Sequence, residues 1–200
     1  MRGGNLSEVI LTGTRLNDAI LPENFLRQFG NIVNGNIEWV SAISNWLPGR
    51  SLSLIYQASR NGFASSNFHQ CCDNRGATLV IVRCNNGFVF GGYAAVSWNS
   101  NGGWIQGQRN SFLFTLKNPH NIPPTRYNCK NPQYELRGHS SYGPSFGNGN
   151  DLHISTNANA NSNSYCNLGN AYEDATGRGT ATFTGNQNFQ VSDYEVFTVQ

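Results

Sequence analysis

Apolar residues recur at helical spacing in the first quarter of the chain. One set falls on a single helical face: Phe25, Leu26, Phe29 and Val33. Pro22 suits the first turn of this helix, whereas Gly30 weakens its middle. Asn36 can cap a second helix, whose apolar stripe follows: Ile37, Val40, Ile43 and Leu47. Because Pro48-Gly49 ends the pattern, residues 20–49 are predicted to form a helical segment that packs against a core.

From residue 51 onward the pattern changes to short apolar runs separated by glycine, asparagine and proline, which is typical of β-strands. Strands are predicted at 51–58, 77–84, 87–96, 111–117, 150–155 and 193–199, with weaker signals at 133–137 and 180–184. The sequence Asn85-Asn86-Gly87 predicts a hairpin turn, because asparagine and glycine tolerate positive φ. A short helix carrying Phe68, His69 and Cys72 is predicted to follow a cap at Ser65 or Ser66. Long loops are predicted at 118–132 and 156–170.

Composition agrees with a mostly β chain that has many turns. The 200 residues include 22 glycines and 12% aromatic residues, and only 12% are charged. We therefore expect an α+β, mostly β fold: a two-sheet antiparallel β-sandwich with flanking short helices. A lead-in at 1–19 and the helical segment at 20–49 would precede the sandwich at 50–200, as one globular domain overall.

Charge, the length of the apolar runs and the cysteine count bear on which partners and which cellular location the chain has. The net charge is +2 and the 13 basic residues are scattered, which does not favour nucleic-acid binding. The apolar runs are too short to insert into a membrane. Five cysteines, an odd number in a chain of this size, favour reduced thiols and a cytoplasmic location.

The segment from Tyr56 to Trp98 contains the spaced motifs Y-x-A-S-R-N-G-F, F-H-x-x-C-D, G-x-T-L, G-x-x-F-G-G-Y and S-W, and in these motifs it resembles the TLDc domain family. That family has a strand ending in Y-x-A-S-R-(D/N)-G-F, a short helix F-H-x-x-C-D, then G-x-T-L and G-x-x-F-G-G-Y, followed by S-W. The matching residues are Tyr56, Ala58, Ser59, Arg60, Asn61, Gly62, Phe63, Phe68, His69, Cys72, Asp73, Gly76, Thr78, Leu79, Gly87, Phe90, Gly91, Gly92, Tyr93, Ser97 and Trp98.

The second half of the chain extends the resemblance to about residues 50–200. Residues 140–152 are similar to the family pattern S-x-x-G-P-x-F-G-x-G-x-D-(L/I), and the later segments resemble S-Y-x-N-x-G-x-x-Y and G-x-x-x-F. The matching residues are Ser140, Gly143, Pro144, Phe146, Gly147, Gly149, Asp151, Leu152, Ser164, Tyr165, Asn167, Gly169, Tyr172, Gly185 and Phe189.

The resemblance implies a non-catalytic, cytoplasmic protein-interaction domain linked to oxidative-stress resistance. Several members of the family bind the vacuolar proton pump (V-ATPase), so its peripheral subunits are the implied protein partner. No catalytic residues are carried over, and no cofactor is implied. The loops at the ends of the sandwich are the expected contact surface.

Side chains with metal-binding or catalytic chemistry have simpler structural interpretations. His69, Cys71, Cys72 and Asp73 form the best metal candidate, but adjacent cysteines lack C-x-x-C spacing and no second Cys/His pair follows. The other thiols are isolated in sequence: Cys84, Cys129 and Cys166. No G-x-S-x-G elbow supports a nucleophilic triad, and three histidines are expected in loops or on strand surfaces: His120, His139 and His153. We therefore predict no catalytic, cofactor or metal residues.

Four further hypotheses concern particular residues. The loop Asn148–Asp151 offers oxygen ligands for Ca²⁺ without the acidic density of an EF-hand, and Asp151 can instead accept backbone N–H bonds. Arg60 and Asp73 could pair. Gly91-Gly92 within a strand predicts a bulge or a close backbone approach.

As the alternative function, a small-ligand or glycan-binding sandwich could stack sugars on exposed rings: Trp98, Trp104 and Tyr142.

Overall fold

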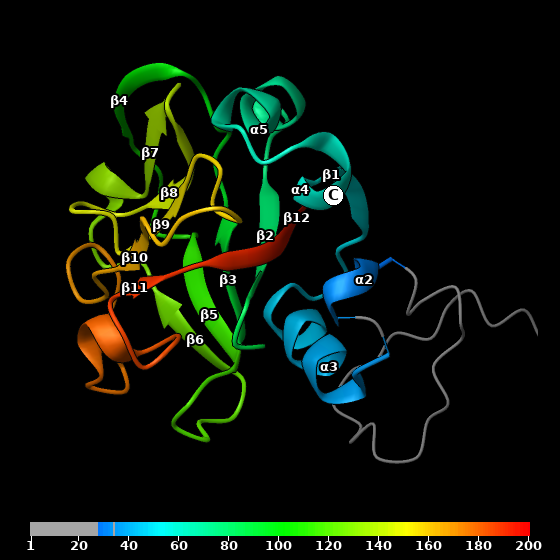
Figure 1. Ribbon diagram of the computed structural model, residues 1–200, viewed down its shortest axis with the longest axis vertical. Coiled ribbons are helices and arrows are strands. Elements are labelled where there is room, and N and C mark those ends of the chain that lie inside the picture. Colours follow the sequence, from blue (N-terminus) through cyan, green and yellow to red (C-terminus); the bar gives the residue numbers. More distant parts are fainter. Residues whose placement is uncertain (1–27, 34) are drawn as a thin grey trace, which may run out of the picture.

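A computed structural model describes residues 28–33 and 35–200, which form two packed six-stranded antiparallel sheets with short helices around them (Figure 1). The predicted β-sandwich with flanking short helices is therefore confirmed. The lead-in at 1–19 and the predicted start of the first helix at Pro22 lie outside the described residues. None of the helices in the described part is long and apolar enough to span a bilayer.

The first sheet contains most of the strands that the apolar pattern predicts. In spatial order its strands are β1 (Leu52–Gln57), β12 (Val191–Val199), β2 (Thr78–Cys84), β3 (Val89–Ala94), β5 (Phe112–Lys117) and β6 (Thr125–Asn128). The β2–β3 hairpin closes as predicted, because Gly87 has a φ of +79° and its N–H donates to the carbonyl of Cys84.

The second sheet consists mainly of strands that the pattern misses. Its order is β11 (Asn188–Phe189), β10 (Ser164–Cys166), β9 (Leu152–Ser155), β8 (Tyr142–Phe146), β7 (Leu136–His139) and β4 (Asn101–Ile105). Of these, β9 was expected at 150–155, and β7 overlaps the weak signal at 133–137. The weaker prediction of a strand at 180–184 is wrong, since a 3-10 helix, η2 (Gly179–Ala181), covers its start and turn residues follow.

Aromatic rings fill the interface between the sheets, and paired glycines let them approach. Trp98 and Phe146 are fully buried and meet edge to face, with ring centres 5.2 Å apart. A Cβ at Gly92 would lie 2.6 Å from the Phe146 ring. At Gly91, a Cβ would collide with the carbonyl of Val80. The predicted close approach at Gly91-Gly92 is therefore confirmed.

Helices α2 (Gly30–Val33) and α3 (Ile37–Trp46) cover the outer face of the first sheet (Figure 1). Asn36 caps α3 as predicted, because its Oδ1 accepts from the N–H of Trp39. The stripe residues Val40 and Ile43 are buried, whereas Ile37 is 48% exposed. Buried residues of both layers form this helix-covered face: Phe29, Ile32, Val33, Val40, Ile43, Leu47, Leu52, Leu79, Ile81, Val89, Phe112, Phe114, Leu116, Phe197 and Val199.

Two short helices follow β1: α4 (Ala58–Asn61) and α5 (Ser65–Cys72). The predicted serine cap of α5 is wrong, because Ala64 occupies the N-cap position without a side-chain bond. Instead Thr156, from a distant loop, accepts from the Ser65 N–H. The predicted loop at 118–132 contains β6 and part of a 3-10 helix, η1 (Pro132–Tyr134), and the predicted loop at 156–170 contains β10.

Candidate functional site

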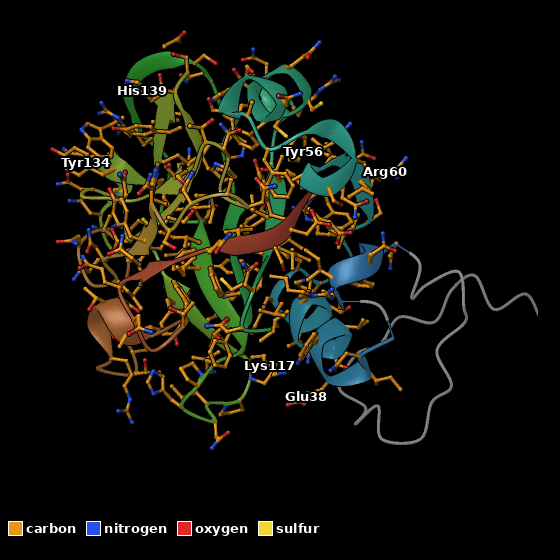
Figure 2. All side chains as sticks on the ribbon, in the orientation of Figure 1. Glu38, Tyr56, Arg60, Lys117, Tyr134 and His139 are labelled. Atoms are coloured by element: carbon orange, nitrogen blue, oxygen red, sulfur yellow. The ribbon has the colours of Figure 1, made fainter. Side chains whose placement is uncertain are left out.

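Aromatic and basic side chains gather on the outer face of the second sheet. We call this set the outer aromatic face: Trp104, Tyr134, Arg137, His139, Tyr142 and Tyr165. Strand alternation explains part of it, since Leu136 and Gly138 of β7 are buried while Arg137 and His139 point outward. Figure 2 shows Tyr134 and His139 on the same side of the molecule, away from Arg60.

Trp104 is the most exposed ring of this face, at 38%. The strand register places it opposite Arg137, whose guanidinium carbon lies 4.5 Å from the centre of the indole. The ring of Tyr134, from η1, lies nearly perpendicular to the same indole at a centre distance of 5.5 Å. The indole is therefore held in place by two neighbours although it is open to solvent.

A second group of rings crosses β7 to β10. His139 and Tyr142 stack with centres 4.4 Å apart, and His153 contacts both Tyr142 and Tyr165. Tyr142 faces outward, although Phe146 enters the core, because the β8–β9 register shifts between Tyr142 and Ser145.

His153 is the buried member of this group. Its Nδ1 lies 2.7 Å from the hydroxyl of Ser145, and desolvation lowers the pKa of His153 to about 4. The imidazole is therefore neutral near pH 7. Ser145 is fully buried, so this serine–histidine pair has no access to a substrate. Sequence reasoning missed the pair, which only the β8–β9 register brings together.

The electrostatic character of this sheet is simple. Its six strands contain Arg137, His139 and His153, and they contain no Asp, Glu or Lys. Since His153 is neutral, Arg137 supplies the permanent charge. The outer aromatic face is therefore weakly basic and rich in rings.

The residues of the metal candidate at His69–Asp73 make hydrogen bonds that connect neighbouring elements of the fold. Nδ1 of His69 lies 2.8 Å from the carboxylate of Asp73, and Nε2 lies 2.9 Å from the carbonyl oxygens of His139 and Tyr142. Cys72 is fully buried in the core. In the part of the chain that the structure describes, no three metal-ligating side chains come together. His69 thus ties α5 to the ends of β7 and β8.

The predicted pairing of Arg60 with Asp73 is wrong. One oxygen of Asp73 binds His69, and the other accepts a hydrogen bond of 2.6 Å from the hydroxyl of Ser100. Arg60 is an exposed residue of α4.

Asp151 satisfies the backbone rather than presenting a ligand. Its carboxylate is fully buried and accepts N–H bonds of 2.8 to 3.2 Å from Gly169, Asn170, Ala171 and Tyr172. Desolvation raises the pKa of Asp151 against these bonds. The prediction that Asp151 accepts backbone N–H groups is confirmed, and the donors come from a distant segment. The loop Asn148–Asp151 therefore lacks a free carboxylate for Ca²⁺.

The remaining candidates divide between core and surface. Trp98 is buried and its Nε1 donates to the Thr78 hydroxyl, so its proposed role in stacking on sugars is wrong. Trp104 and Tyr142 do share one face.

The Nε2 atom of His120 lies 2.8 Å from the carbonyl oxygen of Ala181. Cys84, Cys129 and Cys166 are buried thiols, and burial raises the pKa of each, to about 11 for Cys129 and about 12 for the other two.

Comparison with known proteins agrees with the sequence motifs and the fold. The family model of the TLDc domain matches residues 30–200. No curated protein matches the sequence. The family match spans well over half of the 200 residues, and the chain therefore belongs to the TLDc domain family.

Proposed function

We propose that this TLDc domain is a non-catalytic protein-interaction module and that the outer aromatic face is its contact surface. The single observation that carries the proposal is the composition of that face. Tryptophan, tyrosine and arginine are the residues most enriched among those that dominate binding energy at protein interfaces. Trp104, Arg137 and Tyr142 supply all three on a surface whose strands lack acidic residues and lysine. The proposed surface differs from the loops at the ends of the sandwich, which the sequence analysis expects to make the contact.

A non-catalytic role is supported by the state of the reactive side chains. Ser145 is fully buried beside His153, and His69 binds Asp73 and two backbone carbonyls. Four of the five cysteines are buried. Each of these groups already has a structural partner or lies out of reach of a substrate.

The first partners to test are the peripheral subunits of V-ATPase, in the cytoplasm, as membership in the TLDc family suggests. The proposed link to oxidative-stress resistance has the same support. The neutral to basic character of the outer aromatic face favours an acidic or aromatic surface on the partner.

The test is affinity capture from cell lysate at low and moderate salt, read by mass spectrometry. Wild type is compared with Trp104→Ala and with Leu54→Ala, a control on β1 that is 40% exposed. We expect Leu54→Ala to recover V-ATPase peripheral subunits like wild type and Trp104→Ala to lose them. If all three proteins recover V-ATPase peripheral subunits, the contact surface does not depend on Trp104 and lies elsewhere. Recovery by none would reject this partner.

A carbohydrate ligand is the second candidate function. It is favoured by Trp104 and Tyr142 lying on one partly exposed face, since flat rings stack on sugars. Titration with neutral oligosaccharides should then change the fluorescence of Trp104 and leave that of buried Trp98 unchanged. A Trp104→Phe variant, which removes the reporting indole but keeps a ring, separates a true change at this site from a global one.

A further inference from the structure

An open cleft of about 530 Å³ lies away from the outer aromatic face, between β1, α4 and α5. Its lining residues are Ile55, Asn61, Asn67, Gln70, Cys71 and Arg75. Helices α4 and α5 are neighbours at the upper right of the molecule (Figure 1). The volume falls within the range of about 300 to 1,000 Å³ that is usual for small-molecule sites.

Hydrogen bonds hold three of the lining residues in position. Asn61 Oδ1 accepts from the N–H of Gln57 at 2.9 Å, and Asn67 donates to the carbonyl of Asn61 at 2.6 Å. Arg75 uses only its Nε, which donates to the carbonyl of Cys71 at 3.2 Å. These bonds orient three of the six lining side chains, which lowers part of the entropy that a ligand must overcome. Asn61, Gln70 and Arg75 are exposed, so their remaining donors face solvent.

The same bonds leave donors unused. Among residues 28–33 and 35–200, no acceptor is bound by the terminal guanidinium nitrogens of Arg75, the amide of Gln70 or Nδ2 of Asn61. Within the described part of the chain, no carboxylate lines the cleft. Two acidic side chains of adjoining segments are engaged elsewhere: Asp73 with His69 and Ser100, and Asp193 with Gln57 and Ser59.

We propose that this cleft binds a carboxylate group. A guanidinium presents parallel N–H donors that match the two oxygens of a carboxylate, and amide donors extend the recognition. Arg75 would make this paired contact, and Gln70 and Asn61 would donate to the same group or to a second one. Ile55 supplies an apolar wall for a short aliphatic stem. A small organic acid and the C-terminal carboxylate of a polypeptide share this chemistry.

Cys71 provides a direct readout of occupancy. It lines the cleft and is partly exposed, whereas the other four cysteines are buried. N-ethylmaleimide, a neutral reagent, should therefore label Cys71 first, and a bound carboxylate should slow that labelling. Shifts of the side-chain amide signals of Asn61, Asn67 and Gln70 in NMR spectra give a second readout.

The experiment titrates the full chain with succinate against sodium chloride of equal ionic strength. We expect succinate alone to slow Cys71 labelling with saturation and to shift the cleft amides. Arg75→Gln should weaken this binding about tenfold or more, because a charge-assisted bond is lost. Arg60→Gln, which removes the same charge from exposed α4 outside the cleft, should change it less than about twofold.

Two peptides then distinguish the sources: acetyl-Gly-Gly with a free carboxylate, and the same peptide amidated. Tighter binding of the free peptide than of succinate assigns the site to a chain terminus, and the reverse assigns it to a small acid. The proposal is overturned if the amidated peptide binds equally, if chloride reproduces the succinate effect, or if Arg60→Gln and Arg75→Gln weaken binding alike. Melting temperatures of both variants check that folding is intact.

Discussion

The outer faces of the two sheets differ in how far their side chains are buried. On the first sheet, apolar side chains such as Phe114 and Ile81 are fully buried beneath α2 and α3. On the second, Trp104 remains 38% exposed and its ring neighbours are only partly buried. A covered face stabilises the fold through buried area, whereas an open face of rings is available for recognition.

The covered face also has a polar anchor. Glu195 of β12 is fully buried, and its two oxygens accept from the N–H groups of Asn31 and Ile32 in α2. Arg83 of β2 donates to the carbonyl of Ile32 at 2.6 Å. A Cβ at Gly30, whose φ is +69°, would collide with Glu195. The helical cover is therefore specified by hydrogen bonds and backbone geometry as well as by apolar contact.

The largest expected effect on stability comes from removing a buried ring from the helix-covered face of the first sheet. Phe114→Ala should lower the free energy of unfolding by about 3 to 5 kcal/mol, because it removes a buried ring that lies 5.5 Å from Trp46. Urea denaturation measures the loss. The control Ile37→Ala, on the exposed side of α3, should cost within about 0.5 kcal/mol. Equal losses would mean that the helices are not a stabilising cover.

His153 should make the second sheet sensitive to acid. Its pKa is lowered from 6.5 to about 4, so the unfolded chain binds a proton at a pH where the folded chain does not. The free energy of unfolding should therefore fall as the pH drops from about 6.5 to about 4, by up to about 3 kcal/mol from this residue. Urea denaturation at several pH values, compared with His153→Gln, isolates the contribution. Parallel pH profiles would contradict it.

Glu195 should act in the opposite direction on the first sheet. Desolvation raises the pKa of this carboxyl, so its contribution to stability is complete below pH 4.5 and is lost as the pH rises through the folded value. Glu195→Gln leaves one N–H of α2 without its acceptor and should cost about 1 to 2 kcal/mol. The difference in the free energy of unfolding from wild type should widen as the pH falls toward 4.5. Hydrogen exchange of the Ile32 amide, which should speed up in the variant, locates the effect in α2.

The same contrast explains which strands could be predicted from sequence. The inner strands β2 and β5 of the first sheet are buried on both faces, so they are continuous apolar runs bounded by turn residues. The β2–β3 hairpin and the cap at Asn36 could also be predicted, because each depends on residue types within a few positions of the sequence. The wrong strand at 180–184 arose because Phe183 is buried from an irregular segment, where its ring stacks on Phe90.

Strands of the second sheet give almost no local signal. β4 has two glycines, β11 has two residues, and β8 contains glycine and proline. Their pairing depends on tertiary partners such as the Asp151 carboxylate, which holds a segment some 20 residues away in sequence. The outer aromatic face was foreseen only through Trp104 and Tyr142. Arg137 and His139 joined it because strand register, which a single sequence does not specify, placed them there.

Trp104→Ala should have the smallest effect on stability and a large effect on binding. The ring loses one guanidinium contact and one edge contact in a solvent-exposed setting, so the cost should stay within about 1 kcal/mol. If Trp104 is an anchor for a protein partner, its removal should weaken binding by about thirtyfold or more, measured by titration with the captured partner. Arg137→Gln, which keeps the indole but removes the charge above it, should give an intermediate loss. A Trp104 variant that is destabilised as much as Phe114→Ala, with binding unchanged once its folded fraction is accounted for, would mean that the two faces do not differ in role.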